Sequence, residues 1–299
     1  MKPTVREVHD LNEFIAMTAD LCQADPIATN QIASTAIAVV KGLRSTNDVR
    51  FYVMASGLTD NITSFAMWNS TRGVYLSPTV SSDEAATFGE LVGSMENQPL
   101  VIQCSGVRHV ASAFSVAYCR HHQPTAQFHL KKDLLLYVLE TVQTPTHVTG
   151  RMRQGTAEDM PFLKDWASQF FAFIGAPLVD ASGFMARALP TIFIWDDEAG
   201  TPVAFAGYAP PVQVDETIVY RIGPVFVPEH ERRKGYASAL TAALSLHVLT
   251  KDENVTARVC LYADAANPAS NKAYQNVGYV PVSETSEFEF EAMESDDAK

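Results

Sequence analysis

One segment, residues 220–248, restricts the fold of this chain more than any other. Residues 220–227 are mostly β-branched, aromatic and apolar, which predicts a strand. From residue 236 onward, apolar side chains recur at helical spacing, at Ala237, Leu240, Leu244 and Val248. A basic turn joins these two stretches. The segment therefore predicts a strand, a tight turn and the start of a long helix.

The turn carries the pattern Arg-x-x-Gly-x-Ala, at Arg232, Gly235 and Ala237. A helix N-terminus presents free N–H groups and the positive end of the helix dipole, so it can hold an anion. Gly235 lets a ligand approach the backbone closely, and Arg233 and Lys234 add positive charge. This pattern predicts a pyrophosphate site. Taken alone, it leaves open a second interpretation, a helix that simply follows a solvated basic loop.

A second segment, residues 255–279, begins seven positions after the first one ends. The apolar run 255–260 predicts a strand, and Asn267-Pro268 predicts a turn that starts a short helix. Gly278 ends that helix, and Tyr279 opens another strand. The two segments together predict strand–helix–strand–helix–strand.

These segments resemble the motifs of the GCN5-related N-acetyltransferases. The first resembles the acyl-CoA pyrophosphate loop of that family. The second resembles its Asn-x-x-Ser/Ala-x-x-x-Tyr-x-x-x-Gly-Phe/Tyr motif, here at Asn267, Ser270, Tyr274, Gly278 and Tyr279. The order and spacing of the segments also fit, and the resemblance covers about residues 149–285. It implies an α/β (α+β) fold with a mixed, mostly antiparallel sheet flanked by helices.

The resemblance also implies a reaction and a set of site residues. The reaction is transfer of an acetyl group from acetyl-CoA, the cosubstrate, to a primary amine by direct attack. The backbone of the predicted strand would align the pantetheine arm, and the turn and the two helix starts would hold the rest of the molecule. The implied cofactor-binding residues are Val225, Phe226, Val227, Arg232, Arg233, Gly235, Tyr236, Ala237, Ser238, Asn267, Ser270 and Asn271.

Tyr274 matches the tyrosine that the family places near the thioester sulfur, so we expect it to be the general acid. The alternative is a tyrosine that packs a short helix onto the sheet and bonds its hydroxyl to backbone. The general base stays open among Asp215, Glu216 and Tyr220. We expect His230 to be a cap or a surface residue.

Other chemistry is not favoured. No nucleophile elbow occurs, so a covalent acyl-enzyme is not expected, and no histidine spacing suggests a metal site. The four cysteines are scattered among apolar neighbours, which is typical of a reducing compartment. We therefore expect no metal and a cytoplasmic location.

Charge and hydropathy restrict the partners. The formal net charge is -12, from 22 basic and 34 acidic residues, which argues against nucleic acid. No uncharged apolar stretch long enough for a transmembrane helix occurs, so no membrane partner is expected. Glu287-Phe288-Glu289-Phe290-Glu291 alternates with period two, which predicts a solvated edge strand. A second role for this acidic stretch is to attract a cationic amine.

Pro145 and its threonine neighbours mark the expected domain boundary. We expect residues 1–145 to form a degenerate acetyltransferase-like domain and residues 146–299 an N-acetyltransferase domain. In the first half, helices are expected at 11–21 and 31–43, and a strand pair at 50–55 and 64–69, with its turn at 59–61. A strand at 100–104, a turn at 105–106, a helix at 109–121 and a strand at 134–139 follow.

In the first half, Gly106 stands without the basic pattern, so cofactor binding is not expected there. This half could wall the substrate cleft or support a homodimer. In the second half, Thr156 is expected to cap a helix over 160–173, and residues 191–208 are expected to form a hairpin. The aromatic side chains of that helix could line a pocket, but a plain core face is the more common role.

Two functions from different classes remain open at this point. One is an N-acetyltransferase that acts on a small-molecule or protein amine. The other is a non-catalytic acyl-CoA-binding or scaffold protein on a retired acetyltransferase fold. No motif in the sequence identifies the amine.

Overall fold

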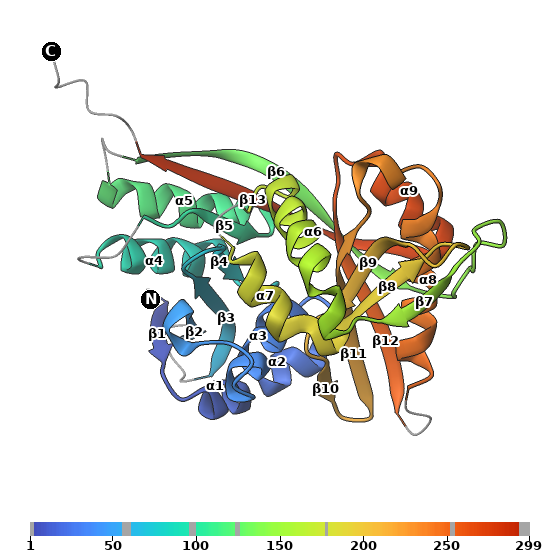
Figure 1. Cartoon of the computed structure of the whole chain (residues 1–299). Coiled ribbons are helices and arrows are strands. Elements are labelled where there is room, and N and C mark those ends of the chain that lie inside the picture. Colours follow the sequence, from blue (N-terminus) through green and yellow to red (C-terminus); the bar gives the residue numbers. More distant parts are fainter. Residues whose placement is uncertain are drawn as a thin grey trace, which may run out of the picture. The chain divides into compact units, whose positions relative to one another are not determined.

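A computed structural model describes residues 3–55, 61–95, 100–122, 126–176, 179–251 and 255–292 (Figure 1). The contacts divide the chain into two compact units. Unit 1 comprises Met1–Leu134 and Glu284–Lys299, and unit 2 comprises Leu135–Ser283. These units differ from the halves expected from the sequence, because the end of the chain belongs with the beginning. The expected domain boundary at 145/146 stays a prediction.

Unit 1 is an α/β unit with one sheet. Its elements are β1 (Thr4–Val8), α1 (Leu11–Met17), α2 (Ala19–Ala24), α3 (Asn30–Val40), β2 (Val49–Ala55), β3 (Ile62–Asn69), β4 (Gly73–Leu76), α4 (Ser82–Gly93), β5 (Gln103–Gly106) and α5 (Arg108–His122). The strand order is β1-β2-β3-β4-β5, continued by β13 (Tyr279–Ala292) and β6 (Ala126–Leu139). The pairs β1–β2, β2–β3, β3–β4 and β5–β13 are antiparallel, whereas β4 and β5 run parallel.

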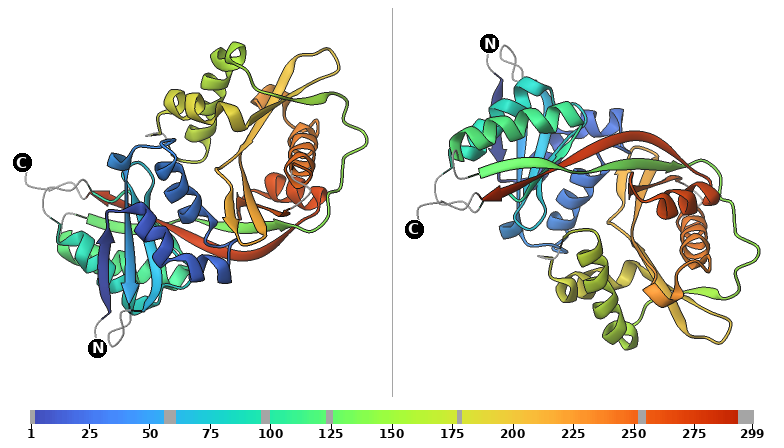
Figure 2. Two further views of the ribbon diagram at one scale, coloured as in Figure 1. Left: turned by 90° about the horizontal axis from the view of Figure 1, so that it is seen from below. Right: turned by 90° about the horizontal axis from the view of Figure 1, so that it is seen from above.

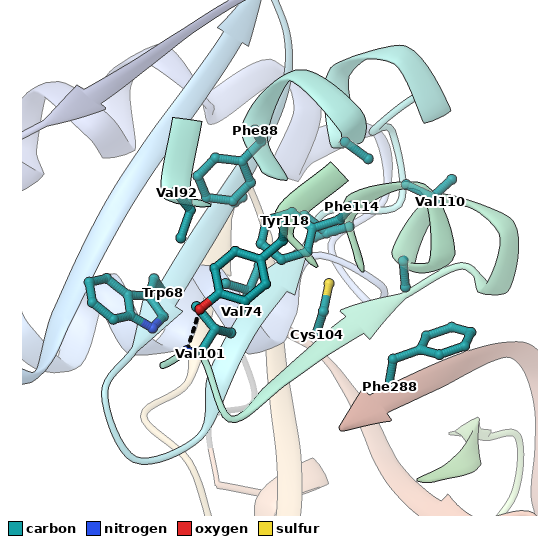
Figure 3. Close-up of a cluster of buried hydrophobic side chains, with 14 of the residues drawn as sticks. Trp68, Val74, Phe88, Val92, Val101, Cys104, Val110, Phe114, Tyr118 and Phe288 are labelled. Atoms are coloured by element: carbon teal, nitrogen blue, oxygen red, sulfur yellow. Dashed lines mark hydrogen bonds between the residues drawn. The ribbon is translucent and has the colours of Figure 1, made fainter. Parts of the chain in front are cut away.

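One face of the unit 1 sheet is covered by α4 and α5, whose aromatic side chains form a buried core (Figure 3). Phe88 packs against Phe114, and Phe114 stacks on Tyr118 with ring centroids 5.9 Å apart. Gly89 allows the two helices to approach closely, since a Cβ there would lie 2.4 Å from the Phe114 carbonyl oxygen. The other face packs against α1 and α3 around Phe14 and Phe51.

The last strand corrects one expectation. Residues 287–291 were expected to form a solvated edge strand, but β13 lies between β5 and β6 in the strand order, and its register with β5 pairs Phe288 with Cys104. Phe288 is buried in the unit 1 core, and Glu287 is only 4% exposed. The acidic side chains are matched by lysines of β6, with Lys132 3.3 Å from Glu287. Alternating charge therefore reflects pairing on both sides here. The long strands β6 and β13 lie side by side and each has residues in both units (Figure 2).

Unit 2 is a second α/β unit. Its elements are β7 (Arg151–Gln154), α6 (Met160–Phe173), α7 (Ala181–Ala188), β8 (Ile192–Asp196), β9 (Pro202–Tyr208), β10 (Val212–Val214), β11 (Thr217–Phe226), α8 (Tyr236–Leu249), β12 (Thr256–Asp264) and α9 (Pro268–Val277). The strand order is β6-β12-β11-β9-β8-β7, and β10 pairs with β11. β11 and β12 run parallel, whereas β11–β9, β9–β8 and β8–β7 are antiparallel.

Most elements expected in the second half are confirmed. Helix α6 has the expected bounds, and Thr156 and Asp159 form a capping box before it. Arg153 holds Asp159 by two hydrogen bonds of 2.7 and 2.8 Å, and these bonds, against some desolvation, lower the pKa of Asp159 to about 2. The hairpin of β8 and β9 is present. Of the α6 aromatics, Phe171 is buried in the core while Phe173 is 63% exposed.

The first half departs further from expectation. The helix expected at 11–21 breaks at Thr18 into α1 and α2. Residues 105–106, expected as a turn, belong to β5. β1, β4 and α4 were not expected at all. Of the turn expected at 59–61, residues 59 and 60 lie outside the described residues.

Candidate functional site

β11 and β12 separate toward their C-terminal ends. Their parallel register runs from Thr217↔Thr256 to Ile222↔Leu261 and then stops, although β11 continues to Phe226. Beyond that point β11 pairs with β9, Val225 with Ala206 and Phe226 with Phe205. In the described part of the chain, the edge of residues 223–226 that faces away from β9 has no strand partner. An extended arm that carries amides could pair with such an edge.

The basic turn brings the chain from β11 into α8 through two left-handed residues. A short 3₁₀ turn covers Glu229–Glu231, and Arg233 then has φ 65° and Gly235 φ 87°. Gly235 is the N-cap residue of α8, and no side chain caps that helix end. The first-turn N–H groups have no acceptor within the helix. They can therefore bind an anion.

Two of the cations of the turn, Arg232 and Lys234, have different surroundings. Arg232 donates from Nε to the Val227 carbonyl oxygen at 3.2 Å, and its guanidinium lies 5.5 Å from the Phe173 ring centroid. Lys234 donates to Glu231 at 2.9 Å, so part of its charge is already compensated. Arg232 is thereby held at the end of β11, next to the uncapped helix.

Gly235 is required for a reason that differs from the one expected. A Cβ at this position would lie 2.7 Å from Cγ2 of Val148. The side of Gly235 on which a side chain would sit is therefore already filled by the segment before β7. The positive φ and this contact, rather than the approach of a phosphate from that side, explain the glycine.

The second motif folds as expected and contacts the first. Asn267 caps α9 by accepting the Ser270 N–H at 3.1 Å, and Gly278 ends the helix with φ 101°. The Ser238 hydroxyl of α8 donates to the Ala273 carbonyl oxygen at 3.4 Å. The start of α8 is thus tied to the residue that precedes Tyr274.

Tyr274 lies between two other tyrosines and is 9% exposed. Its ring centroid is 6.3 Å from that of Tyr137 and 6.2 Å from that of Tyr279. Burial raises the pKa of Tyr274, and a hydrogen bond with the Ser270 side chain offsets part of the shift. The phenol therefore holds its proton at neutral pH, as a proton donor requires.

The Asn271 side chain makes its hydrogen bonds to other residues of the protein. Its Nδ2 donates to the carbonyl oxygens of Asp264 and Ala265 at 3.0 and 3.2 Å. Its Oδ1 accepts the Tyr137 hydroxyl at 3.2 Å. The side chain joins the end of β12 to β6, and its expected contact with the cofactor stays a prediction.

The candidates for the general base are spread along β11. Asp215 and Glu216 are exposed in the β10–β11 turn, and Glu216 precedes Val225 by nine positions, about 30 Å along an extended strand. Tyr220 is buried, edge-on to Tyr208 at 5.4 Å. His230 is exposed, 3.7 Å from Glu231. The turn carboxylates are therefore far from the separated strand ends.

In unit 1, the turn that corresponds to the basic turn before α8 is not the one at Gly106. The parallel pair β4–β5 corresponds to β11–β12, so the counterpart of α8 is α4 and the counterpart of α9 is α5. The turn before α4 is residues 77–81, which contains no basic residue and no glycine. Ser81 and Glu84 form a capping box there, with Glu84 accepting the Ser81 N–H at 2.8 Å. Glu84 is 4% exposed, and although burial acts to raise its pKa, hydrogen bonds from Thr63 and Ser81 hold the pKa below its usual value.

Sequence reasoning missed Tyr137 and Val148 as neighbours of the site. Both precede β7, and the first lies in a run, residues 134–139, that indicates a buried strand and nothing else. No motif marks either residue, because each acts through a contact made in three dimensions.

Metal sites and membrane-spanning helices are absent from the described residues. No group of three or more His, Cys, Asp or Glu side chains in that part of the chain could hold a metal ion. None of its helices is long and apolar enough to cross a membrane.

Comparisons with known proteins bear on the family and the fold. Residues 159–279 match the model of the Acetyltransferase (GNAT) family. No curated protein matches the chain. The structure is similar to a GNAT-family acetyltransferase from Colwellia psychrerythraea, with TM-score 0.56, 15% identity and 96% of this chain and 100% of that chain covered.

Two further solved structures have the same fold. A GCN5-related N-acetyltransferase from Sphaerobacter thermophilus gives TM-score 0.55 at 13% identity, covering 97% of this chain and 96% of that one. A tandem GNAT protein from the clavulanic acid biosynthesis pathway gives TM-score 0.57 at 10% identity, covering 98% and 100%. Residues 159–279 of the chain therefore match the GNAT family, and the chain has the fold of a tandem GNAT protein. Family and fold support an acyltransferase function.

Proposed function

We propose that unit 2 transfers an acetyl group from acetyl-CoA to a primary amine by direct attack, without a covalent acyl-enzyme. The observation that carries this proposal is the start of α8. An uncapped helix N-terminus follows the exposed Arg232 and Arg233 and stands next to the unpaired end of β11. Pyrophosphate is the group that such a helix start fits best.

The remaining residues have consistent roles in this reaction. The first-turn N–H groups from Tyr236 to Ser238 would bind the pyrophosphate, and the edge of residues 223–226 would align the pantetheine arm. Holding the amine and the thioester in line removes much of the entropy cost of a bimolecular reaction. Attack forms the new C–N bond and breaks the C–S bond. Tyr274 would then give its proton to the departing thiolate, and the proton that the attacking nitrogen loses on becoming an amide would restore Tyr274 through solvent.

The acceptor is proposed by class only, as a small-molecule or protein amine. An alkylamine has a pKa near 10, so it must lose a proton before it attacks. Of the three base candidates, Tyr220 lies closest along β11 to the separated strand ends. The proton of the alkylammonium group would pass to solvent by way of the Tyr220 hydroxyl. We also propose a cytoplasmic location for the protein. A homodimer stays a prediction.

The proposal is tested by measuring release of free thiol from acetyl-CoA in the presence of a panel of primary amines. Turnover with at least one amine, lost in Tyr274→Phe while acetyl-CoA still binds, is the expected result. Acetyl-CoA binding without turnover for any amine, including lysine peptides, would favour the non-catalytic binding protein instead. Absence of binding by the folded protein would refute both functions.

A further inference from the structure

A residue before the expected domain boundary contacts the catalytic helix. Tyr137 lies in β6, is fully buried, and belongs to the same core as Tyr274. We propose that Tyr137 is a positioning residue for Tyr274, which it holds through Asn271. This inference rests on the proposed function, because it assigns Tyr137 a part in the same reaction.

The orientation of the Asn271 amide is fixed by its partners. Two carbonyl oxygens, those of Asp264 and Ala265, lie on one side of the amide, and a carbonyl can only accept. The NH₂ group must therefore face them, which leaves Oδ1 toward the Tyr137 hydroxyl. Tyr137 donates its single hydroxyl proton to that oxygen. It is thus not a proton source for the thiolate, and its effect on the reaction is indirect.

The bond from Tyr137 acts on the turn of α9 that precedes the catalytic tyrosine. Asn271 stands three positions before Tyr274 on the same helix, so both side chains lie on one face. Asn271 links that face to the end of β12 by its hydrogen bond to the Asp264 carbonyl oxygen. Tyr137 of β6 holds the Asn271 amide in this orientation by its own hydrogen bond. The Tyr137 ring also packs beside Tyr274, tilted by 55°. Loss of the hydroxyl leaves this ring contact in place but releases the amide.

The tyrosine on the other side provides a matched control. Tyr279 lies at nearly the same distance from Tyr274, and its hydroxyl is also hydrogen-bonded. Its partner is Ser245 of α8, at 2.7 Å, and not a residue of α9. Tyr279→Phe therefore removes a buried hydroxyl from the same core without touching the start of α9.

The test compares Tyr137→Phe with Tyr279→Phe in the full-length chain by amide hydrogen exchange. The Ser270 and Asn271 amides bond to Asn267 and report the stability of the first turn of α9. We expect their exchange to be about three- to tenfold faster in Tyr137→Phe, the range that one lost hydrogen bond gives, and unchanged in Tyr279→Phe. Equal exchange in Tyr137→Phe and wild type would overturn the inference.

The second readout separates positioning from a merely structural role. With the best amine of the panel, Tyr137→Phe should lower kcat about fivefold to tenfold and leave the KM for acetyl-CoA unchanged. Asn271→Ala should lower kcat at least as much, because it also loses the bonds to Asp264 and Ala265, and the double variant should lose no more than Asn271→Ala alone. An unchanged kcat in Tyr137→Phe would overturn the catalytic part. If wild type shows no turnover, the proposed function fails, while the exchange experiment still decides whether Tyr137 holds α9.

Discussion

Helices α4 and α8 occupy the same place in their units, yet their N-termini are built for different partners. Each follows a strand that pairs in parallel with the next strand along the chain. The end of α4 is closed by its own Ser81 and the buried Glu84. The N-terminus of α8 has Gly235 as its N-cap residue, without a side-chain cap, and follows three basic residues. The buried Glu84 carboxylate puts a negative charge at the start of α4, which disfavours a phosphate there, so we propose the cofactor site for unit 2 alone.

The counterpart helices α5 and α9 also differ, in the hydrogen bonds of their tyrosines. Tyr118 of α5 is 2% exposed, and its hydroxyl accepts the Val101 N–H at 2.9 Å (Figure 3). This is the packing role considered for Tyr274 from sequence. The Tyr274 hydroxyl instead has a side-chain partner, Ser270, on its own helix. The two tyrosines therefore differ in their hydrogen-bond partners, and the general-acid role is proposed for Tyr274 alone.

The largest effect on kcat is expected from Tyr274→Phe, and Tyr118→Phe is its control. Tyr274→Phe should lower kcat about 100-fold with little change in acetyl-CoA affinity, since general acids contribute at least that much. Tyr118→Phe should leave kcat unchanged but lower the free energy of unfolding by about 1–3 kcal/mol, because the buried Val101 N–H loses its acceptor. Steady-state kinetics and urea unfolding of both variants measure this. A similar kcat loss in both would mean that Tyr274 acts only through packing.

Gly235→Val should weaken acetyl-CoA binding about 50-fold. A valine there is strained at φ 87° and would meet Val148, so the first turn of α8 would move. Gly200→Val is the control, because Gly200 has φ 82° and a Cβ there would have no atom within 4 Å. Calorimetric titration should show normal affinity in the control. Equal losses in both variants would assign the effect to backbone strain in general.

Ser238→Glu would make the start of α8 resemble that of α4. Ser238 is the third residue of α8, as Glu84 is the third residue of α4. A carboxylate there should weaken acetyl-CoA binding about 10-fold or more by repulsion, while adding stability to the helix. The neutral Ser238→Gln variant should bind much better than Ser238→Glu. If the two bind alike, charge at this helix end does not determine binding.

The smallest effect on the cofactor is expected from Glu84→Gln. This variant should leave acetyl-CoA affinity unchanged and reduce the hydrogen-exchange protection of α4 by about 1–2 kcal/mol. The folded pKa of Glu84 lies below its unfolded value of about 4.3. Its stabilising effect is therefore complete above that pH and is lost as the pH falls through the folded pKa.

The protection factors of α4 amides in wild type, which are corrected for the intrinsic pH dependence of exchange, should fall over this acidic range, and the fall should be smaller in Glu84→Gln. A wild-type profile that matches the variant would show that Glu84 is not ionised in the folded protein. Gain of a second acetyl-CoA site in the variant would show that the negative charge of Glu84 alone keeps unit 1 from binding.

Much of unit 2 could be predicted because its signals are local. The glycines at 235 and 278 and the cap at Asn267 each act within a few residues, and the structure has all three. The choice of Gly106 as the comparison point in the first half was wrong for the opposite reason. β4 has only four residues, so the strand that marks α4 as the counterpart of α8 is too short to recognise.

The long-range features could not be predicted from residue patterns. The alternation at Glu287–Glu291 is the same for an edge strand and for a strand paired on both sides, and the choice depends on the distant Lys131 and Lys132. Tyr137 lies more than 130 positions from Asn271, and their bond leaves no pattern along the chain. Such contacts appear only once the sheets are assembled.

The most direct measurement of the central claim is the stoichiometry of acetyl-CoA binding by isothermal titration calorimetry of the full-length chain. The account predicts one site per chain, kept in Glu84→Gln and strongly weakened in Ser238→Glu. Two sites per wild-type chain, or a single site that Ser238→Glu leaves intact, would contradict the assignment of the cofactor to the start of α8.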